Sequence, residues 1–373
     1  MLLKYYFKVA SWSILSIAIL AVIGLFASKE NFLPQDSGPV SEEKKSNLPF
    51  EIVAQNLEIP WEIVFLPNGD MLVTERPGRV VRIGKDRKVY PISGVAHVGE
   101  GGLLGLALHP KFSENNFLYI YLTTQERGKV TNRVERYKFA SDKLTDRQVI
   151  LSGIPGASVH DGGRMAFSPD GYLYITTGEA GQEKLSQDTS NLGGKILRIR
   201  DDGSIPADNP FGNAVYSYGH RNSQGLAWDD QGQLWSTEHG RSGVASGFDE
   251  LNLIEKGKNY GWPEIQGDET RKGMEKPVAN SGANTTWAPS GAAFYKGSIF
   301  FSGLRGEALY EYKMDEKELK THFKGDFGRI RAVVLGGKPD HYLYITTSNR
   351  DGRGTVQADD DKIIKVNLDN LGI

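Results

Sequence analysis

The stretch AFSPDGYLYITTGE, which spans residues 166–179, decides the fold class of this chain. An apolar run meets a Pro-Asp-Gly turn, and an aromatic and β-branched run then follows and ends in threonine. Asp-Gly between two such runs is a strong β-hairpin signal, because glycine readily adopts the positive φ that a tight turn needs. The stretch therefore predicts two antiparallel strands joined by a short turn.

The same pattern recurs in five other places. The other copies are FLPNGDMLVTE from Phe65, ALHPKFSENNFLYIYLTT from Ala107, AWDDQGQLWSTEHG from Ala227, AFYKGSIFFSG from Ala293 and VLGGKPDHYLYITTSN from Val334. The six starting positions lie 41 to 66 residues apart, which suits propeller blades with loops inserted between some strands. The repeat therefore predicts an all-β, six-bladed β-propeller with four-stranded blades over residues 50–373. A β-sandwich or two barrels are the alternatives, but six similar hairpins fit radial repetition better.

The N-terminus carries the parts of an export signal. Lys4 and Lys8 precede an apolar run over residues 9–27, which is just long enough to span a bilayer. We therefore expect a signal peptide or membrane-anchoring helix at residues 1–27 and a polar linker at residues 28–49. The positive flank stays inside, so the propeller is predicted to be periplasmic or extracellular. The alternative is that the apolar run is a buried helix of the folded domain.

Composition excludes several classes of function. The chain has 44 Lys and Arg against 46 Asp and Glu, so no basic field is present to hold nucleic acid. It has no cysteine, which excludes disulfides, thiol catalysis and iron–sulfur ligation.

Four stretches are too polar for their apolar surroundings. They are HDGGR at residues 160–164, GHRNSQG at 219–225, the segment from Asp249-Glu250 to KNYGWP at 258–263, and RIR at 329–331. On local sequence alone, His160 is better explained as a hydrogen-bonded turn residue. Each arginine equally fits a solvated salt bridge, and the loop with Glu250 and Tyr260 equally fits a surface loop. Together, however, a histidine base, several arginines and an oxygen-rich loop at one mouth of the channel suggest a multiply anionic ligand.

The chain resembles the soluble PQQ-dependent glucose and aldose sugar dehydrogenases over most of residues 50–370. The matching segments, in one order, are Pro60-Trp61, EGGLLGLA from Glu100, GGKILR from Gly193, GHRNSQG from Gly219, NYGWP from Asn259 and WAPS from Trp287. The resemblance implies oxidation of an aldose at its anomeric carbon to a lactone, with PQQ and calcium as cofactors. Electrons would then pass to an unidentified acceptor, and the protein would be a monomer or a homodimer.

The resemblance also implies roles for individual residues. His160 matches the general base that deprotonates the anomeric hydroxyl, and Arg221 matches a residue that polarises the quinone. The other matches with cofactor-binding positions are Glu100, Arg164, Asn222, Gln224, Arg305, Arg329 and Arg331, and the substrate positions match Glu179 and Trp287. The carbonyls of Gly240 and Arg241 match ligands of the calcium beside PQQ. The carboxylate of Glu250 and the carbonyl of Tyr260 match ligands of a second, structural calcium.

Some positions depart from the glucose dehydrogenases. Glu100 stands where they have glutamine, Glu179 where they have aspartate, and Arg305 where they have lysine. Asn284 replaces an aromatic residue, so the sugar preference is expected to differ. A carboxylate at position 100 is unfavourable beside a carboxylated cofactor unless it is protonated or paired.

Two other functions compete with sugar oxidation. A calcium-dependent lactonase or esterase propeller needs several carboxylates and amides around a channel calcium, and no such acidic set is evident in the sequence. A non-catalytic propeller that binds a protein or another ligand would not need His160 together with Arg221, Asn222, Arg329 and Arg331.

Overall fold

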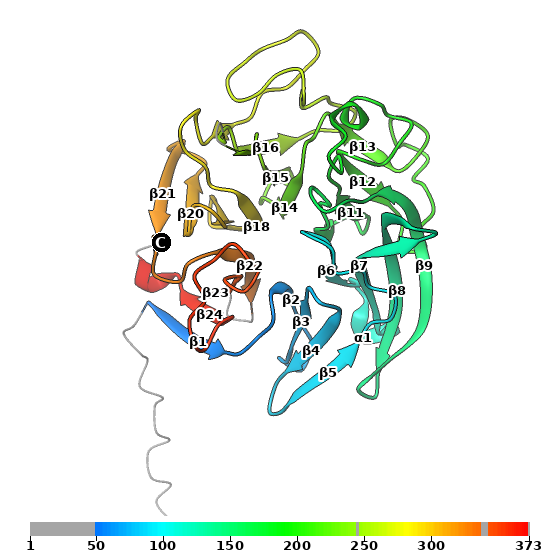
Figure 1. Ribbon diagram of the computed structural model, residues 1–373, viewed down its shortest axis with the longest axis vertical. Helices are drawn as coiled ribbons and strands as arrows, with labels where there is room; N and C mark the ends of the chain where they lie inside the picture. The colour runs from blue at the N-terminus through cyan, green and yellow to red at the C-terminus, as the bar shows by residue number, and fades with distance from the viewer. Residues whose placement is uncertain (1–48, 244–245, 337–341, 372–373) are drawn as a thin grey trace, which may run out of the picture. The chain divides into compact units, whose positions relative to one another are not determined.

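Six four-stranded antiparallel sheets are arranged around a central channel, which confirms the predicted all-β, six-bladed propeller (Figure 1). This computed structural model describes residues 49–243, 246–336 and 342–371, which belong to one compact unit. The predicted signal or anchor segment, residues 1–27, and nearly all of the predicted linker lie outside the described residues. Among the described helices, none has the length and apolar character needed to cross a membrane.

The blades follow one another along the chain, and each runs from the channel outward. The first three are β2 (Pro60–Phe65), β3 (Met71–Glu75), β4 (Arg79–Ile83) and β5 (Arg87–Pro91); β6 (Leu103–Leu108), β7 (Phe117–Glu126), β8 (Lys129–Ala140) and β9 (Lys143–Pro155); and β10 (Met165–Phe167), β11 (Leu173–Thr176), β12 (Lys195–Ile199) and β13 (Val215–Tyr218). The fourth and fifth are β14 (Ser223–Trp228), β15 (Leu234–Glu238), β16 (Glu250–Ile254) and β17 (Ala279–Asn280); and β18 (Pro289–Tyr295), β19 (Ser298–Gly303), β20 (Ala308–Lys313) and β21 (Glu318–His322). Within the described ranges, short helical turns connect strands or follow the last one, among them α1 (Phe112–Asn115), η1 (Glu183–Ser186) and η3 (Asp369–Leu371).

The sixth blade joins the two ends of the domain. Its inner strands are β22 (Ile330–Gly336), β23 (Tyr342–Thr347) and β24 (Ile363–Asn367), and its outermost strand is β1 (Phe50–Ala54). β1 pairs antiparallel with β24, and Phe50 lies opposite Val366. The ring of blades is therefore closed by strand pairing between the beginning and the end of the domain.

Each predicted hairpin forms the two innermost strands of one blade. In four of the blades, a threonine or serine near the end of the repeat bonds to the inner strand of the next blade. Thr74, for example, donates to the carbonyl of Leu104 at 2.6 Å, and Thr237 donates to that of Ser290 at 2.7 Å. In the second and third blades, Thr123 and Thr177 bond within their own blade instead. In all of these cases the hydroxyl satisfies a buried polar group.

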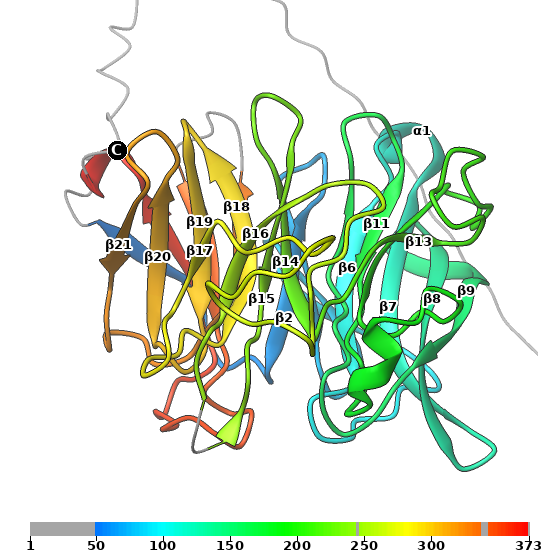
Figure 2. The ribbon, with the colours of Figure 1, turned by 90° about the horizontal axis from the view of Figure 1, so that it is seen from above.

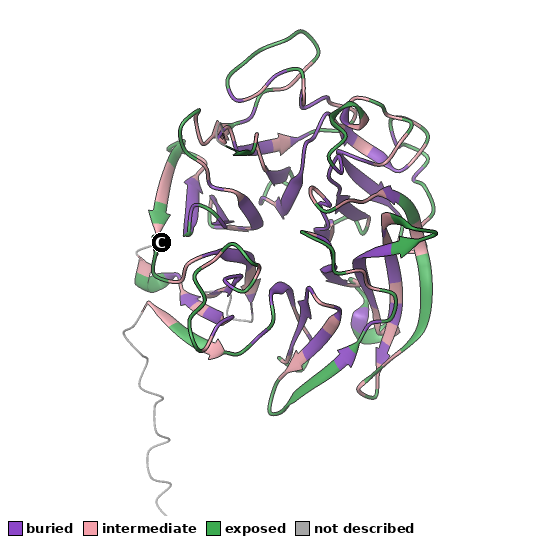
Figure 3. Cartoon of the chain, in the orientation of Figure 1, coloured by how far each residue is buried: buried purple, intermediate pink, exposed green. Residues whose placement is uncertain are grey.

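The innermost strands are irregular at the end where the site forms. Register shifts occur near the start of β2, β6, β14, β18 and β22. A bulge bends a strand and re-aims its side chains, so polar residues in otherwise apolar strands are turned toward the channel. Burial decreases from the channel outward. The inner strands of the blades are buried, whereas the outer strands β5, β9 and β21 expose many residues (Figure 3).

Candidate active site

A cavity of about 490 Å³ opens at the channel end where the innermost strands begin. The loops that follow β5, β15 and β23 gather at this end of the ring (Figure 2). The residues that line the cavity include Glu100, His160, Arg221, His239, Gly240, Arg241, Asp249, Arg305, Arg329 and Arg353. The structure therefore brings six of the predicted site residues, Glu100, His160, Arg221, Arg241, Arg305 and Arg329, and the predicted calcium ligand Gly240 into one cavity.

His160 is held in one orientation by contacts on both ring nitrogens. Its Nδ1 lies 2.9 and 2.8 Å from the two carboxylate oxygens of Glu179. Its Nε2 lies 2.9 Å from Nη2 of Arg221. Since a carboxylate only accepts hydrogen bonds and a guanidinium only donates them, Nδ1 carries the proton and Nε2 offers the lone pair. In this structure the lone pair accepts from Arg221, so a substrate hydroxyl would have to take the place of that contact before His160 could act as a general base.

Arg221 connects this histidine to the loop that follows β15. Its Nη2 also donates to the hydroxyl of Ser242 at 2.8 Å, and its guanidinium lies 5.3 Å from the ring centroid of Trp262. Burial lowers the pKa of Arg221, although Glu179 and Glu100 act in the opposite direction. The group is a buried cation beside a base, which suits it to stabilise negative charge that develops in the cavity.

Glu100 is ionised and forms an ion pair. From the sequence, its carboxylate was expected to be unfavourable beside a carboxylated cofactor unless it was protonated or paired, and the ion pair meets that condition. Burial raises its pKa, but the backbone N–H of His160, His239 and Arg353 together lower it to about 2. Arg353 Nη1 donates to Oε1 of Glu100 at 2.8 Å. The carboxylate is therefore compensated by the protein itself.

Arg329 and Arg331 share one carboxylate. Nε and Nη2 of Arg329 lie 3.0 and 2.7 Å from Oδ2 of Asp351, and Nη2 of Arg331 lies 3.8 Å from the same oxygen. Burial lowers the pKa of Arg331 to about 9. Only Arg329 lines the cavity, and Arg331 lies deeper, 5.8 Å from the ring of Trp61. Two cations against one anion leave a positive excess near the cavity floor.

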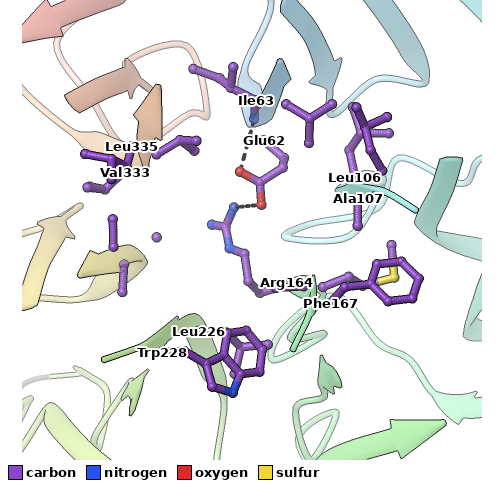
Figure 4. A pocket seen from close by; sticks show the side chains of 18 of the residues that line it. Glu62, Ile63, Leu106, Ala107, Arg164, Phe167, Leu226, Trp228, Val333 and Leu335 are labelled. Atoms are coloured by element: carbon purple, nitrogen blue, oxygen red, sulfur yellow. Dashed lines mark hydrogen bonds and ion pairs between the residues drawn. The ribbon is translucent and has the colours of Figure 1, made fainter. Parts of the chain in front are cut away.

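Arg164 lies toward the opposite mouth of the channel. It forms an ion pair with Glu62, donates to the carbonyl of Gln224 at 3.0 Å and lies 4.0 Å from the ring of Trp61. It lines a second cavity of about 630 Å³, whose walls come from the far ends of the inner strands. Figure 4 shows Arg164 and Glu62 pointing toward each other into that cavity. The structure does not bring Arg164 into the first cavity, and its contact with a cofactor stays a prediction.

Asn222 and Gln224 are buried between the two cavities. Oδ1 of Asn222 accepts the backbone N–H of Gly162 at 3.0 Å, and Nε2 of Gln224 donates to the carbonyl of Gly162 at 3.3 Å. Both amides thus fix the glycine segment that follows His160. Neither amide lines the first cavity, and their cofactor contacts stay predictions.

The two predicted substrate residues have different environments. Glu179 is buried, and its carboxylate bonds to the ring of His160. Trp287 is only 6% exposed and packs its ring against Phe301 and Tyr310 at centroid distances of 5.2 and 5.7 Å. The structure thus places the Trp287 side chain in the core of the fifth blade and not in the cavity lining.

The segment with Gly240 and Arg241 is shaped by close backbone contacts. A Cβ at Gly240 would lie 2.3 Å from the carbonyl oxygens of Gly247 and Phe248, so only glycine fits. The Arg241 guanidinium lies 4.7 Å from the ring of Phe248.

Glu250 and Tyr260 line a small cavity of about 10 Å³ together with Glu238, and Arg221, His239 and Gly240 line both this cavity and the first one. Burial, with the nearby Glu238 carboxylate, raises the pKa of Glu250 to about 8. The phenol of Tyr260 donates to the carbonyl of Leu253 at 2.6 Å, so only its backbone oxygen remains for the predicted role. Two buried carboxylates in one small space suit a divalent cation. Across the described ranges, no cluster of three or more His, Asp or Glu side chains is arranged to hold a metal.

Several buried side-chain nitrogens near the cavity have no hydrogen-bond partner in the protein. Among the described residues, they include Arg221 Nη1, His239 Nε2, Arg241 Nε and Trp262 Nε1. Buried donors of this kind are costly unless a ligand or water satisfies them. Together with Arg305 and Arg329 of the lining, the unpaired donors of Arg221 and Arg241 fit a multiply carboxylated group such as PQQ.

Three residues of the cavity were not assigned from the sequence. Asp249 accepts the backbone N–H groups of Gly240, Trp287 and Ala288 at 2.9, 2.7 and 2.9 Å, and so joins two loops. Burial lowers the pKa of His239 to about 4, which keeps its ring neutral. Asp249 and His239 lie within stretches that were already singled out in the sequence. The sequence around Arg353 has no comparable motif. Its position in the cavity depends on how the sixth blade closes the ring of blades.

A six-bladed propeller whose channel cavity is lined by two histidines and several arginines suits an oxidoreductase that holds an anionic organic cofactor. The family model described as glucose / sorbosone dehydrogenase matches residues 57–357, so the chain belongs to that family.

Individual relatives agree with this membership. Aldose sugar dehydrogenase YliI of Escherichia coli is 34% identical over 342 residues, covering 81% of this chain and 90% of the relative. The PQQ-bound aldose sugar dehydrogenase of Streptomyces coelicolor is 39% identical, with a TM-score of 0.79 over 85% of this chain and 96% of that one. A putative glucose dehydrogenase of Thermus thermophilus is 43% identical, with a TM-score of 0.80 over 85% and 99% of the two chains.

Proposed function

We propose that this protein is a PQQ-dependent aldose sugar dehydrogenase that oxidises the anomeric carbon of an aldose to a lactone. The observation that carries the proposal is the line from Glu179 through His160 to Arg221 at the cavity wall. PQQ, when bound, supplies the group that accepts the hydride from the anomeric carbon. We further propose that an external acceptor takes up the electrons and that the protein works as a monomer or homodimer. We also propose that it is exported or anchored through residues 1–27.

The chain's own residues handle the proton. Nε2 of His160 takes the proton of the anomeric hydroxyl, and Glu179 stabilises the positive charge that forms on the ring. Arg221 lies beside the same nitrogen and offers its unpaired Nη1 to negative charge that develops in the cavity. Arg305 and Arg329 line the cavity as sites for cofactor carboxylates.

The proposal also includes two calcium sites. The backbone oxygens of Gly240 and Arg241 would hold one ion beside the cofactor, and Glu250 with the Tyr260 carbonyl would hold a second. Glu238 belongs to the second site as well, because it lines the same small cavity. The pairing of two buried carboxylates supports the second site.

The test uses residues 28–373 with PQQ, calcium and a panel of aldoses, and follows the reduction of an artificial dye. His160→Ala is expected to lower turnover by a factor of about 10² to 10⁴ while PQQ binding is retained. His109→Ala, which removes a histidine bonded to Asp201 outside the cavity lining, is the control. Normal turnover by His160→Ala would contradict the mechanism, and lactone cleavage without PQQ would favour the hydrolase alternative.

A further inference from the structure

Glu100 and Arg353 form an ion pair in the cavity wall that the proposed proton transfer does not use. Glu100 lies in the loop before β6, and Arg353 lies in the loop between β23 and β24. The 2.8 Å bond between them therefore joins the second blade to the sixth. Both side chains line the same cavity as His160.

The second oxygen of Glu100 holds the backbone of His160. Oε2 accepts the His160 backbone N–H at 3.0 Å. His160 has a φ of 57°, a left-handed conformation that a residue with a Cβ adopts only under constraint. On its other side, the His160 carbonyl accepts the N–H of Ala180 at 3.2 Å, and a Cβ at Gly178 would lie 1.9 Å from that carbonyl oxygen. The backbone of the base is thus fixed from both directions.

The surroundings keep Glu100 charged. Arg353, Arg221 and Arg76 are the cations that act on it at neutral pH, where the ring of His239 is neutral, and Asp161 is the nearby group of like charge. Although burial raises its pKa, the His160 N–H, His239 and Arg353 lower it to about 2. The acceptor for the His160 N–H therefore does not titrate near neutral pH.

We propose that Glu100 is a positioning residue for His160, and that Arg353 fixes the direction of the Glu100 carboxylate. The proposal rests on the proposed function, because it gives His160 the part of the base. It makes Glu100 an acceptor for the loop of the base and not a direct contact of the cofactor. A glutamine at this position keeps an oxygen for the His160 N–H but loses the ion pair with Arg353.

The experiment compares Glu100→Ala, Glu100→Gln and Arg353→Met in the protein loaded with PQQ and calcium. Glu100→Ala leaves the His160 N–H without its acceptor, so kcat is expected to fall about ten- to a hundredfold. Glu100→Gln is expected to restore kcat to within about fivefold of the parent protein, since its carbonyl oxygen replaces the carboxylate oxygen. Arg353→Met should match Glu100→Gln, and the double variant should be no worse than either, because both remove one interaction.

Arg271→Met is the matched control. Arg271 pairs with Glu264 and has the same side-chain exposure as Arg353, 57%, but it lies outside the cavity lining. This variant should leave kcat unchanged. If Glu100→Ala does not fold, Arg353→Met supplies the second test, because the exposed side chain can be replaced without opening the core.

Two further readouts separate positioning from general damage. The affinity of each variant for PQQ, measured by fluorescence titration, should stay within about threefold of the parent value. The ¹⁵N and ¹H chemical shifts of the His160 backbone amide, which report its hydrogen bond to Glu100, should change in Glu100→Ala and return toward the parent values in Glu100→Gln. This readout decides the proposal even if no aldose is oxidised, so failure of the proposed function is recognised separately. Unchanged amide shifts and unchanged kcat in Glu100→Ala, or equal losses in Glu100→Gln and Glu100→Ala, would overturn it.

Discussion

The reactivity of His160 depends on which of its nitrogens carries the proton. Glu179 accepts from Nδ1, and Gly181 donates its N–H to the same carboxylate at 2.8 Å, so the acceptor is itself held in place. A carboxylate bonded to Nδ1 both selects the tautomer and stabilises the protonated ring. His160 and Glu179 were each singled out from the sequence, but the contact between them could be seen only in the structure.

Replacement of Glu179 by glutamine tests this contact. The amide can donate to Nδ1 and thereby move the ring proton to Nε2, so kcat is expected to fall by a factor of about 10² to 10⁴. Loss of the carboxylate also disfavours the protonated ring. The acid limb of the kcat/KM profile should therefore move to lower pH. Glu183→Gln, at an exposed position of η1, is the control. A profile that coincides with the parent one would show that Glu179 does not act on the base.

Arg221 and a lysine are not equivalent at this position. The guanidinium bonds to His160 and Ser242 through one nitrogen and leaves Nη1 unpaired for a ligand. A lysine offers a single charged group that cannot reach both sides. Arg221→Lys is therefore expected to lower kcat about ten- to a hundredfold in steady-state dye reduction, with a smaller change in KM for sugar. A change confined to KM would assign Arg221 to sugar binding alone.

At the level of elements, the sequence predicted the inner strands of each blade, because a local pattern of apolar residues and turn residues marks them. All six hairpins were found because their strands are buried and their turns use Asp-Gly, Asn-Gly or similar residues. The outer strands gave no comparable signal, since β5 and β21 are partly exposed and β17 has only two residues. The convergence of His160 with Arg221 and Arg329 was expected, because each stretch directly precedes a blade. The burial of Trp287 and the pairing of Arg164 with Glu62 were not expected, because both depend on contacts between residues distant in sequence.

The strand β16 and the loops around it lead to a prediction on calcium and pH. Burial and Glu238 raise the pKa of Glu250 to about 8, well above its ordinary value of 4.5. Without calcium, the folded state therefore binds a proton that the unfolded state releases between about pH 4.5 and 8. The contribution to stability is fully present below about pH 4.5 and is lost as pH rises through about 8. Thermal unfolding with a chelator should show this loss.

Calcium should reverse that pH dependence. The ion replaces the proton on Glu250, so added calcium is expected to raise Tm most at about pH 8 and to release protons on binding. Glu250→Gln should remove both effects while leaving the protein folded. An equal rise of Tm at about pH 5 and about pH 8, in both proteins, would place calcium elsewhere.

At the level of the whole molecule, the channel has a cavity at each end. The Arg164–Glu62 ion pair lines the larger cavity, and Arg164 also donates to the backbone carbonyl of Gln224. These charge-assisted contacts join residues of three blades across the channel.

The ring itself depends on the strand that comes from the other end of the domain. Phe50 of β1 packs edge-on against Phe323 and Phe327, with ring centroids 5.9 and 4.9 Å away. Phe50→Ala is expected to lower the free energy of unfolding by about 2 kcal/mol, because it removes a half-buried ring at the closure. Val89→Ala, in the outer strand of the first blade and 45% exposed, should cost less than about 0.5 kcal/mol. Since Arg329 and Arg331 begin the innermost strand of the same blade, Phe50→Ala should also weaken PQQ binding. Urea unfolding with and without PQQ measures both effects, and equal losses in the two variants would show that closure by β1 contributes nothing special to stability.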